Sequence, residues 1–277
     1  MKKIFLSLAL AISMMASAQV FEVGQLTKLN TPTDTDVKVA GVSADGSYVL
    51  ITSGSNQGLR RYDVATGKTT TISTAAGAGY NVQISNDGQE LVYRETSFDK
   101  QGLRKNNIVR HDLATAKTAT IAKGQRDMMA MTTTGANVSV SINDRKIVLN
   151  KNGKNIVLAP NGSNESYIWP SVSPDGTKLC YYVCGNGCWV SNIDGSNKQY
   201  IGHDCRAAQW YDNNTLVAMA DEDDGHFTTA SVVVAYTLDG KKQVLTNSSM
   251  IAMYPYVAEN LIVFSTLEGE TYMLNVK

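Results

Sequence analysis

Four cysteines and a neighbouring histidine are the residues whose types and spacing most suggest chemistry. Cys184 and Cys188 flank a Gly-Asn-Gly turn between two strand-like runs. A hairpin there would bring the two residues opposite one another, within disulfide range. The spacing therefore favours a Cys184–Cys188 disulfide, which leaves Cys180 and Cys205 as a second pair or as buried free thiols. The alternative is a zinc site that includes His203, but Cys-x3-Cys-x3-Cys is not a standard zinc spacing.

Recognisable catalytic motifs do not occur in the sequence. It contains no Gly-x-Ser-x-Gly elbow, no glycine-rich phosphate loop and no His-Glu-x-x-His pair. The acidic run from Asp221 to His226 is rich enough in oxygen to suggest Ca²⁺, but its spacing does not match an EF-hand loop and a solvated loop is the simpler interpretation. His111 takes the place in its repeat that Tyr62 holds in another, which favours packing. We therefore predict no catalytic residues, no metal and no cofactor.

The first eighteen residues have the features of a signal peptide. Lys2 and Lys3 precede an apolar run from Ile4 to Met15, and Ala16-Ser17-Ala18 is a small-x-small cleavage site that would leave Gln19 first. The apolar run is shorter than the roughly twenty residues that a membrane-spanning helix needs. No later segment is long and apolar enough to span a bilayer. These features predict a protein that is periplasmic or secreted, where disulfides persist.

Composition indicates a folded protein and excludes one class of partner. Hydrophobic residues make up 43% of the chain and charged residues 18%, which argues against disorder. Lysine and arginine total 25, as do aspartate and glutamate, and loss of the leader removes two lysines. Without a basic excess, nucleic acid is not expected as a partner.

A strand pattern with Asp-Gly turns repeats along the chain. The clearest copy runs from Trp169 to Ser196, and similar copies begin at Val39 and Val82. Each reads as four short strands with alternating apolar and polar residues. Equivalent apolar positions just before the turns are Val42, Ile84, Met131, Val172, Trp210 and Val257, with spacings of 42, 47, 41, 38 and 47 residues. Such a period is typical of the blades of a β-propeller.

The two ends of the chain indicate how the ring closes. The sixth copy supplies only three strands before the chain ends, and Val23–Leu29 resembles the fourth strands of other copies. We therefore predict an all-β protein in which residues 19–277 form one six-bladed β-propeller of four-stranded antiparallel blades, the last blade closed by the N-terminal strand. A five-bladed or open array is the alternative. The count is weakest at the third copy, Met128 to Pro160, whose turn we expect near Thr134-Gly135.

One motif resembles a known family. The segment Trp169-Pro170-Ser171-Val172-Ser173-Pro174-Asp175-Gly176-Thr177 resembles the Pro-Asp repeat of TolB-type propellers, and Tyr254-Pro255-Tyr256-Val257 is a partial echo. TolB proteins are periplasmic, carry an α/β domain ahead of the propeller and bind partners of the Tol–Pal system. The resemblance implies an envelope binding protein without that first domain, which leaves the Tol–Pal role itself unsupported. Some pectate-degrading lyases with similar propellers bind a metal through several histidines, which His203 and His226 match only in part.

The face on which consecutive blades connect is the candidate site. Residues just upstream of the innermost strands would surround the channel mouth, namely Tyr80, Arg126, Tyr167, Trp169, Arg206 and Tyr254. Aromatic residues and arginine are common anchors of binding surfaces, although several of these side chains could instead pack between blades. We therefore predict a non-enzymatic module that binds an envelope protein, peptide or glycan. The alternative is a polysaccharide lyase or glycosidase, which carboxylates and histidines converging on the mouth would favour.

Overall fold

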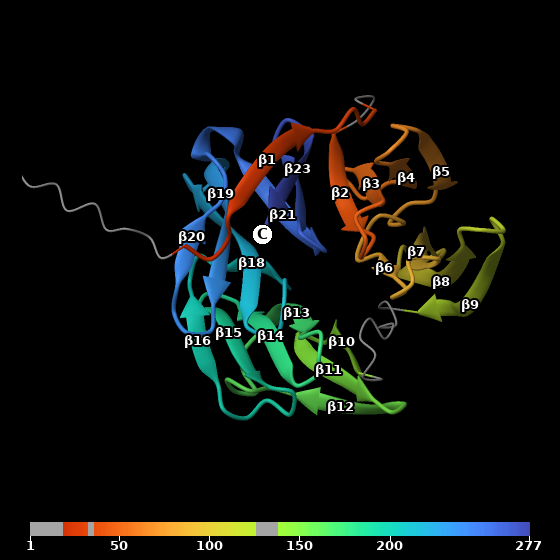
Figure 1. Cartoon of the computed structure of the whole chain (residues 1–277). Helices are drawn as coiled ribbons and strands as arrows, with labels where there is room; N and C mark the ends of the chain where they lie inside the picture. The colour runs from red at the N-terminus through yellow and green to blue at the C-terminus, as the bar shows by residue number, and fades with distance from the viewer. Residues whose placement is uncertain (1–18, 33–35, 126–137) are drawn as a thin grey trace, which may run out of the picture.

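Six antiparallel sheets surround a central channel in the computed structural model (Figure 1). The structure describes residues 19–32, 36–125 and 138–277. The predicted signal peptide therefore lies outside the described residues. Apart from a single 3-10 turn, η1 (Ser248–Met250), all regular structure in the described ranges is β-strand. No helix in these ranges is long and apolar enough to cross a membrane. The prediction of a six-bladed β-propeller is confirmed.

The strands follow one another outward within each blade. The first two blades contain β2 (Val37–Val42), β3 (Tyr48–Ser53), β4 (Leu59–Asp63), β5 (Thr69–Ser73), β6 (Gln83–Ile84), β7 (Glu90–Phe98), β8 (Arg104–Asp112) and β9 (Thr118–Gln125). The next two contain β10 (Val138–Asn143), β11 (Lys146–Lys151), β12 (Lys154–Leu158), β13 (Tyr167–Val172), β14 (Lys178–Val183), β15 (Gly187–Asn192) and β16 (Gln199–Gly202). The last two contain β17 (Arg206–Trp210), β18 (Thr215–Asp223), β19 (Thr228–Thr237), β20 (Lys242–Val244), β21 (Ala252–Ala258), β22 (Leu261–Thr266), β23 (Thr271–Val276) and β1 (Val23–Lys28).

The repeat positions identified from the sequence fall at equivalent places in the blades. Val42, Ile84, Val172 and Trp210 each end the first strand of a blade, and Val257 is the last residue but one of β21. The third blade has three strands within the described residues, and the other five have four. Met131 and the turn expected near Thr134-Gly135 lie outside the described residues. The third copy, whose sequence pattern is weakest, is thus also the blade with fewer than four strands among the described residues.

Ring closure joins the two ends of the chain, as predicted. β1 lies antiparallel to β23 and completes the sixth blade as its outer strand. The Glu22 and Lys277 backbones exchange two hydrogen bonds, of 2.9 and 3.0 Å. The Gln243 side chain of the fifth blade accepts from the Phe21 N–H at 2.7 Å and donates to the Phe21 carbonyl at 3.0 Å. The closing strand is therefore tied to two blades.

A recurring turn joins the first and second strands of three blades. In the fourth blade, Asp175 accepts from the Ser173 hydroxyl at 2.6 Å and from the Thr177 N–H at 3.0 Å. These bonds hold the pKa of Asp175 below its usual value. Gly176, with φ of 72°, takes the left-handed conformation that the turn requires. Asp45 and Asp87 accept the equivalent backbone bond in the first and second blades.

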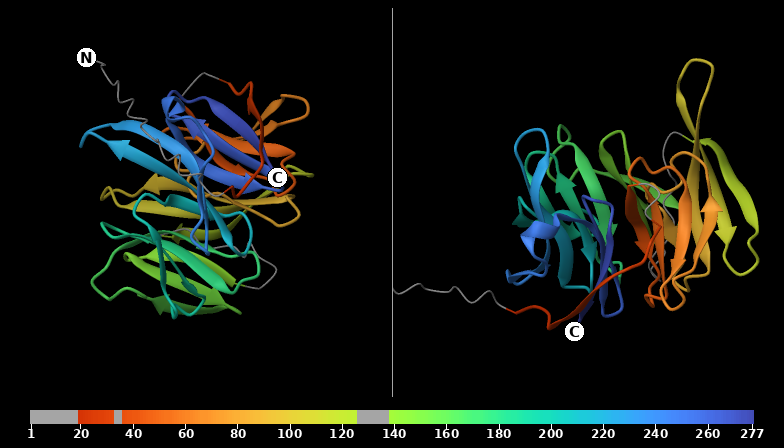
Figure 2. Two further views of the ribbon diagram at one scale, coloured as in Figure 1. Left: turned by 60° about the vertical axis from the view of Figure 1, so that its left-hand side comes forward. Right: turned by 90° about the horizontal axis from the view of Figure 1, so that it is seen from above.

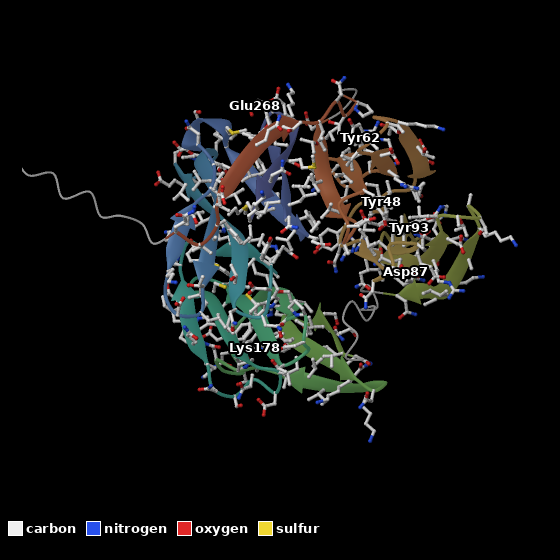
Figure 3. All side chains as sticks on the ribbon, viewed as in Figure 1. Tyr48, Tyr62, Asp87, Tyr93, Lys178 and Glu268 are labelled. Atoms are coloured by element: carbon white, nitrogen blue, oxygen red, sulfur yellow. The ribbon has the colours of Figure 1, made fainter. Side chains whose placement is uncertain are left out.

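The core lies between neighbouring blades. Five clusters of buried apolar side chains each draw most of their members from two adjacent blades. Tyr48 and Tyr93, labelled in Figure 3, share the cluster between the first and second blades. The Tyr48 hydroxyl also donates to the Gly88 carbonyl at 2.9 Å, which links the turns of these blades. Within the described residues, packing between neighbouring blades thus joins the third blade to the fourth, and so on through the sixth and first blades to the second.

Replacing single side chains near the N-terminal strand β1 tests how far the fold depends on closure of the ring. Phe21 is 5% exposed, and its ring packs edge-on against the ring of Tyr211, with 4.6 Å between the ring centroids. Val23, two residues further along the chain, is 43% exposed. We expect Phe21→Ala to lower the free energy of unfolding by about 3–5 kcal/mol in urea denaturation, because it empties a core position. Val23→Ala, the control, should change it by less than about 0.5 kcal/mol. Equal effects of the two substitutions would contradict this account of closure.

Candidate functional site

One end of the propeller, here called the mouth face, carries most of the candidate residues. The first strand of a blade begins there, and the hairpin between its second and third strands turns there. Figure 2, seen from above, shows these hairpins at the end of the ring opposite the C-terminus. Strands that begin at one face can present their first side chains to the channel opening. The topology therefore gathers residues from distant parts of the sequence on this face.

A strained bulge recurs at the start of three first strands. The pairing register shifts between Ile168 and Ser171 in β13, and likewise in β17 and β21. Within these bulges Trp169, Ala207 and Tyr254 have φ of 50°, 50° and 49°. Residues other than glycine adopt this left-handed conformation at a cost of order 1–2 kcal/mol, and such strain concentrates at functional sites. The bulges turn the chain so that a bulky side chain can stand at the channel opening.

Trp169 and Arg206 form the centre of one cluster on the mouth face. The Arg206 guanidinium lies over the Trp169 ring, 5.6 Å from its centroid, and bonds the carboxylate of Asp221 at 2.8 Å. Tyr182 meets the Trp169 ring edge-on at 5.5 Å. Arg206 Nε and Asp221 Oδ1 are buried without a hydrogen-bond partner. Each such atom costs of order 1–3 kcal/mol, so the cluster is polar, tightly packed and incompletely satisfied.

Tyrosines from two other blades form a second cluster. Tyr80 is 49% exposed, and the Arg94 guanidinium lies over its ring at 4.1 Å from the centroid. Burial and then the phenol groups of Tyr254 and Tyr80 raise the pKa of Tyr256 to about 12. Tyr80 precedes the first strand of the second blade, whereas Tyr254 and Tyr256 lie in that of the sixth. The two clusters thus bring aromatic and arginine side chains together near the starts of first strands.

The predicted mouth residues divide into three groups. The structure places Tyr80, Trp169, Arg206 and Tyr254 on the mouth face. Tyr167 is 1% exposed and packs between the third and fourth blades, with its hydroxyl bonded to the Asn161 N–H at 2.9 Å and the Gly162 carbonyl at 3.1 Å. Tyr167 therefore packs between blades, which was the alternative role expected for several of these residues. Arg126 lies outside the described residues.

Four residues of these clusters were not among the predicted mouth residues. Arg94, Tyr182 and Asp221 lie on second strands, β7, β14 and β18, and Tyr256 lies two residues beyond a predicted site residue. Met219 is the residue paired with Arg206 beyond the bulge, so Asp221, two residues further along β18, meets Arg206 diagonally. Only the repeat register together with the bulge could have identified that contact. Tyr256 could have been predicted from the sequence, because it belongs to the same partial motif, Tyr254-Pro255-Tyr256-Val257, as the predicted site residue Tyr254.

The predicted Cys184–Cys188 disulfide is not formed, and all four cysteines are free thiols. The residue paired with Cys188 is Tyr182, because Gly187 still belongs to β15 and Cys184 falls in the turn. Cys184 is consequently exposed while Cys188 is buried. The Cys180 and Cys188 sulfurs instead approach to 3.6 Å. The hydrogen bond to Cys188 and burial raise the pKa of the Cys180 thiol well above its usual value, which keeps it unreactive.

The candidate metal ligands do not gather into one site. Within residues 19–32, 36–125 and 138–277, no group of three or more histidine, cysteine or acidic side chains is placed to hold a metal ion. In the acidic run, Asp221 is bound to Arg206, and the Asp223 and Asp224 carboxylates accept backbone N–H groups of their own hairpin. His111 is buried and bonds Thr118 at 3.0 Å. These residues have local structural roles.

The ion pair at the mouth can be tested by removing one or both charges. Asp221 is 7% exposed and Arg206 is 35% exposed. We expect Arg206→Met to cost about 3 kcal/mol of unfolding free energy, because it leaves a buried carboxylate unpaired. The double variant Arg206→Met/Asp221→Leu should recover most of that loss in the same urea titration. If the double variant is no more stable than the single one, Arg206 stabilises the protein through packing on Trp169 rather than through its charge.

Thiol reactivity provides a test of the cysteine arrangement. We expect one of the four thiols, Cys184, to react with Ellman's reagent in the folded protein and all four to react after denaturation, since three are buried. Cys184→Ser should abolish the reaction of the folded protein. Only two reactive thiols in denatured, unreduced protein would instead indicate a disulfide.

Comparisons with known proteins give similarity in fold. No family model and no curated protein matches the chain. A TolB structure from Agrobacterium tumefaciens has a TM-score of 0.58 at 16% identity over 87% of this chain and 90% of that one. TolB from Acinetobacter baumannii has a TM-score of 0.52 at 14% identity over 85% of this chain and 53% of its own, so the chain spans about half of that protein. An oligogalacturonate lyase in complex with manganese has a TM-score of 0.51 at 15% identity over 85% of this chain and 76% of that one. The chain therefore shares its propeller fold with TolB proteins and with this lyase.

Proposed function

We propose that this protein is an exported, non-enzymatic binding module that takes a protein, peptide or glycan of the cell envelope on its mouth face. The observation that carries the proposal is the concentration of Trp169, Arg206, Tyr80 and Tyr254 around the channel opening. Tryptophan, tyrosine and arginine are the residue types that dominate binding energy at interfaces. Two clusters of such side chains fit a ligand that lies across the opening.

Two further observations support the proposal. The leader of residues 1–18 supports export, because its charged, apolar and small-residue regions follow in the order of a signal peptide. The left-handed backbone at Trp169 and Tyr254 supports a functional role, because strained residues of this kind concentrate at functional sites. The fold shared with TolB proteins is consistent with a binding role.

A small-molecule pocket fits the geometry less well than a broad surface. Two shallow pockets, of about 160 and 190 Å³, lie between blades, one beside Tyr48 and the other beside Tyr236. Pockets for small ligands usually measure about 300–1,000 Å³. The aromatic side chains of the mouth contribute to neither pocket. The mouth therefore suits a chain-like or macromolecular ligand.

Catalysis is the alternative function, by analogy with the oligogalacturonate lyase. That enzyme's structure contains manganese, whereas the carboxylate at this mouth, Asp221, is already bound to Arg206. We expect no unsaturated product, followed by ultraviolet absorbance, when the mature chain is incubated with oligogalacturonate and Mn²⁺. Turnover that is lost in Asp221→Asn would overturn the non-enzymatic proposal.

A matched pair of tyrosine substitutions tests binding at the mouth. Tyr254 on the mouth face is 38% exposed, and Tyr200 on the outer strand β16 is 48% exposed. The biotinylated mature chain serves as bait for solubilised envelope proteins and cell-wall glycan fragments, and the captured species is then titrated by calorimetry. We expect Tyr254→Ala to weaken binding at least about tenfold, because it removes an aromatic anchor, and Tyr200→Ala to leave affinity unchanged.

Thermal unfolding of the same variants provides the control for folding. Both tyrosine variants should unfold within a few degrees of the wild type, since both side chains are substantially exposed. A captured species that binds Tyr254→Ala and Tyr80→Ala as tightly as the wild type would exclude the mouth face as its site.

A further inference from the structure

Two hairpins project from the mouth face on opposite sides of the channel. β7 and β8 pair over nine residues, from Glu90 with Asp112 to Phe98 with Arg104, and β18 and β19 also form nine pairs. The equivalent strands β3 and β4 form four pairs, and β14 and β15 form six. The two hairpins belong to the second and fifth blades, which face one another across the ring in Figure 1 and rise from the same face in Figure 2.

The tips of these hairpins expose large apolar side chains. Phe98 and Leu103 are 67% and 64% exposed at the tip of the β7–β8 hairpin, and Phe227 is 75% exposed at the tip of the β18–β19 hairpin. Single exposed apolar residues are common on protein surfaces, but here they gather at two protruding tips of one face. Protruding apolar tips are accessible to a partner before the rest of the face is.

The two tips carry opposite charge. Residues 98–105 contain Lys100, Arg104 and Lys105 against a single acidic residue, Asp99. Lys105 is bound to Asp99 at 3.3 Å, while Lys100 and Arg104 form no ion pair within the described part of the chain. The β18–β19 tip instead carries the acidic run of residues 221–224, in which Asp221 is ion-paired with Arg206 and the Asp223 and Asp224 carboxylates accept backbone N–H groups of their own hairpin. A basic tip and an acidic tip therefore stand half a turn apart on one face.

This arrangement is self-complementary. A twofold axis lying in the plane of the mouth face turns a second copy over and places its second blade opposite the fifth blade of the first. Each basic tip then meets an acidic tip, and the contact occurs twice. A foreign partner with a single sign of charge would be attracted to one tip and repelled by the other. Opposite charges at opposed positions thus favour a second copy as the occupant.

We propose that the mouth faces of two copies of this chain pair through their β7–β8 and β18–β19 hairpins, with Phe98, Leu103 and Phe227 buried at the two contacts. Because the tips project beyond the ring, they meet first, and the mouth clusters of both copies face the space between them. The pairing does not depend on the proposed function, since it uses neither Trp169 nor Tyr254. It would, however, restrict the mouth to ligands that can enter between the rings.

The test is sedimentation equilibrium of the mature chain at about 0.1 M and about 1 M NaCl, because exposed charge pairs are strongly screened at the higher salt. We expect concentration-dependent dimers that weaken with salt. Lys100→Glu/Arg104→Glu makes both tips acidic. Because Asp221 is paired with Arg206, Glu222→Lys/Asp223→Lys leaves two lysines against Asp224 and makes both tips basic. Each variant alone should dissociate at least about tenfold more readily than the wild type, because both contacts become repulsive.

Charge exchange separates this pairing from a folding defect. An equimolar mixture of the two charge variants should form a heterodimer, and a chain that carries all four substitutions should recover the homodimer. Phe227→Ser, which keeps every charge, should also weaken the dimer. A wild type that stays monomeric at all concentrations at low salt would overturn the proposal, as would a dimer that both charge variants leave intact or a mixture that gains no heterodimer.

Discussion

Closure of the ring is the constraint on which the rest of this structure depends. The sixth blade obtains its outer strand from the other end of the chain, where β1 lies along β23. With that strand the sixth blade has four strands, and Phe21 just before it packs into the cluster between the fifth and sixth blades. Because Gln243 also binds the Phe21 backbone, the same segment joins the fifth blade to the sixth. This segment thereby fixes the sixth blade, the last in the chain, to the blade before it.

The mouth face combines a repeated backbone with variable side chains. The bulge and its left-handed residue recur in the fourth, fifth and sixth blades, but the residue is Trp169 in one, Ala207 in the next and Tyr254 in the third. The small Ala207 leaves room beside Arg206, whose guanidinium covers the Trp169 ring. Repeat geometry therefore fixes where side chains meet, and the residue type at each bulge determines what they can bind. This separation explains how one scaffold can support both binding proteins and enzymes.

Local patterns predicted the fold well because the strands and turns are encoded over short distances. Period-two alternation and the Asp-Gly turns identified five of the six positions that end or nearly end a first strand, and the unmatched Val23–Leu29 segment predicted closure. The candidate site was harder to predict, because its contacts cross between strands and blades. The burial of Tyr167 depends on the neighbouring blade, and the pairing of Arg206 with Asp221 depends on a bulge. The disulfide prediction was wrong because it depended on the register of one hairpin: Cys188 is paired with Tyr182 and not with Cys184.

The energetic cost of the mouth is small beside the energy of the core, which makes binding and stability separable. A left-handed residue costs of order 1–2 kcal/mol and a buried polar atom without a partner of order 1–3 kcal/mol, whereas emptying a single core position such as Phe21 costs about 3–5 kcal/mol. The five clusters between the blades contain many residues of that kind. A ring held together between its blades can therefore tolerate strain and incomplete hydrogen bonding at one end. The same reasoning applies to the two long hairpins, whose tips extend beyond the core and can change in charge without changing the ring.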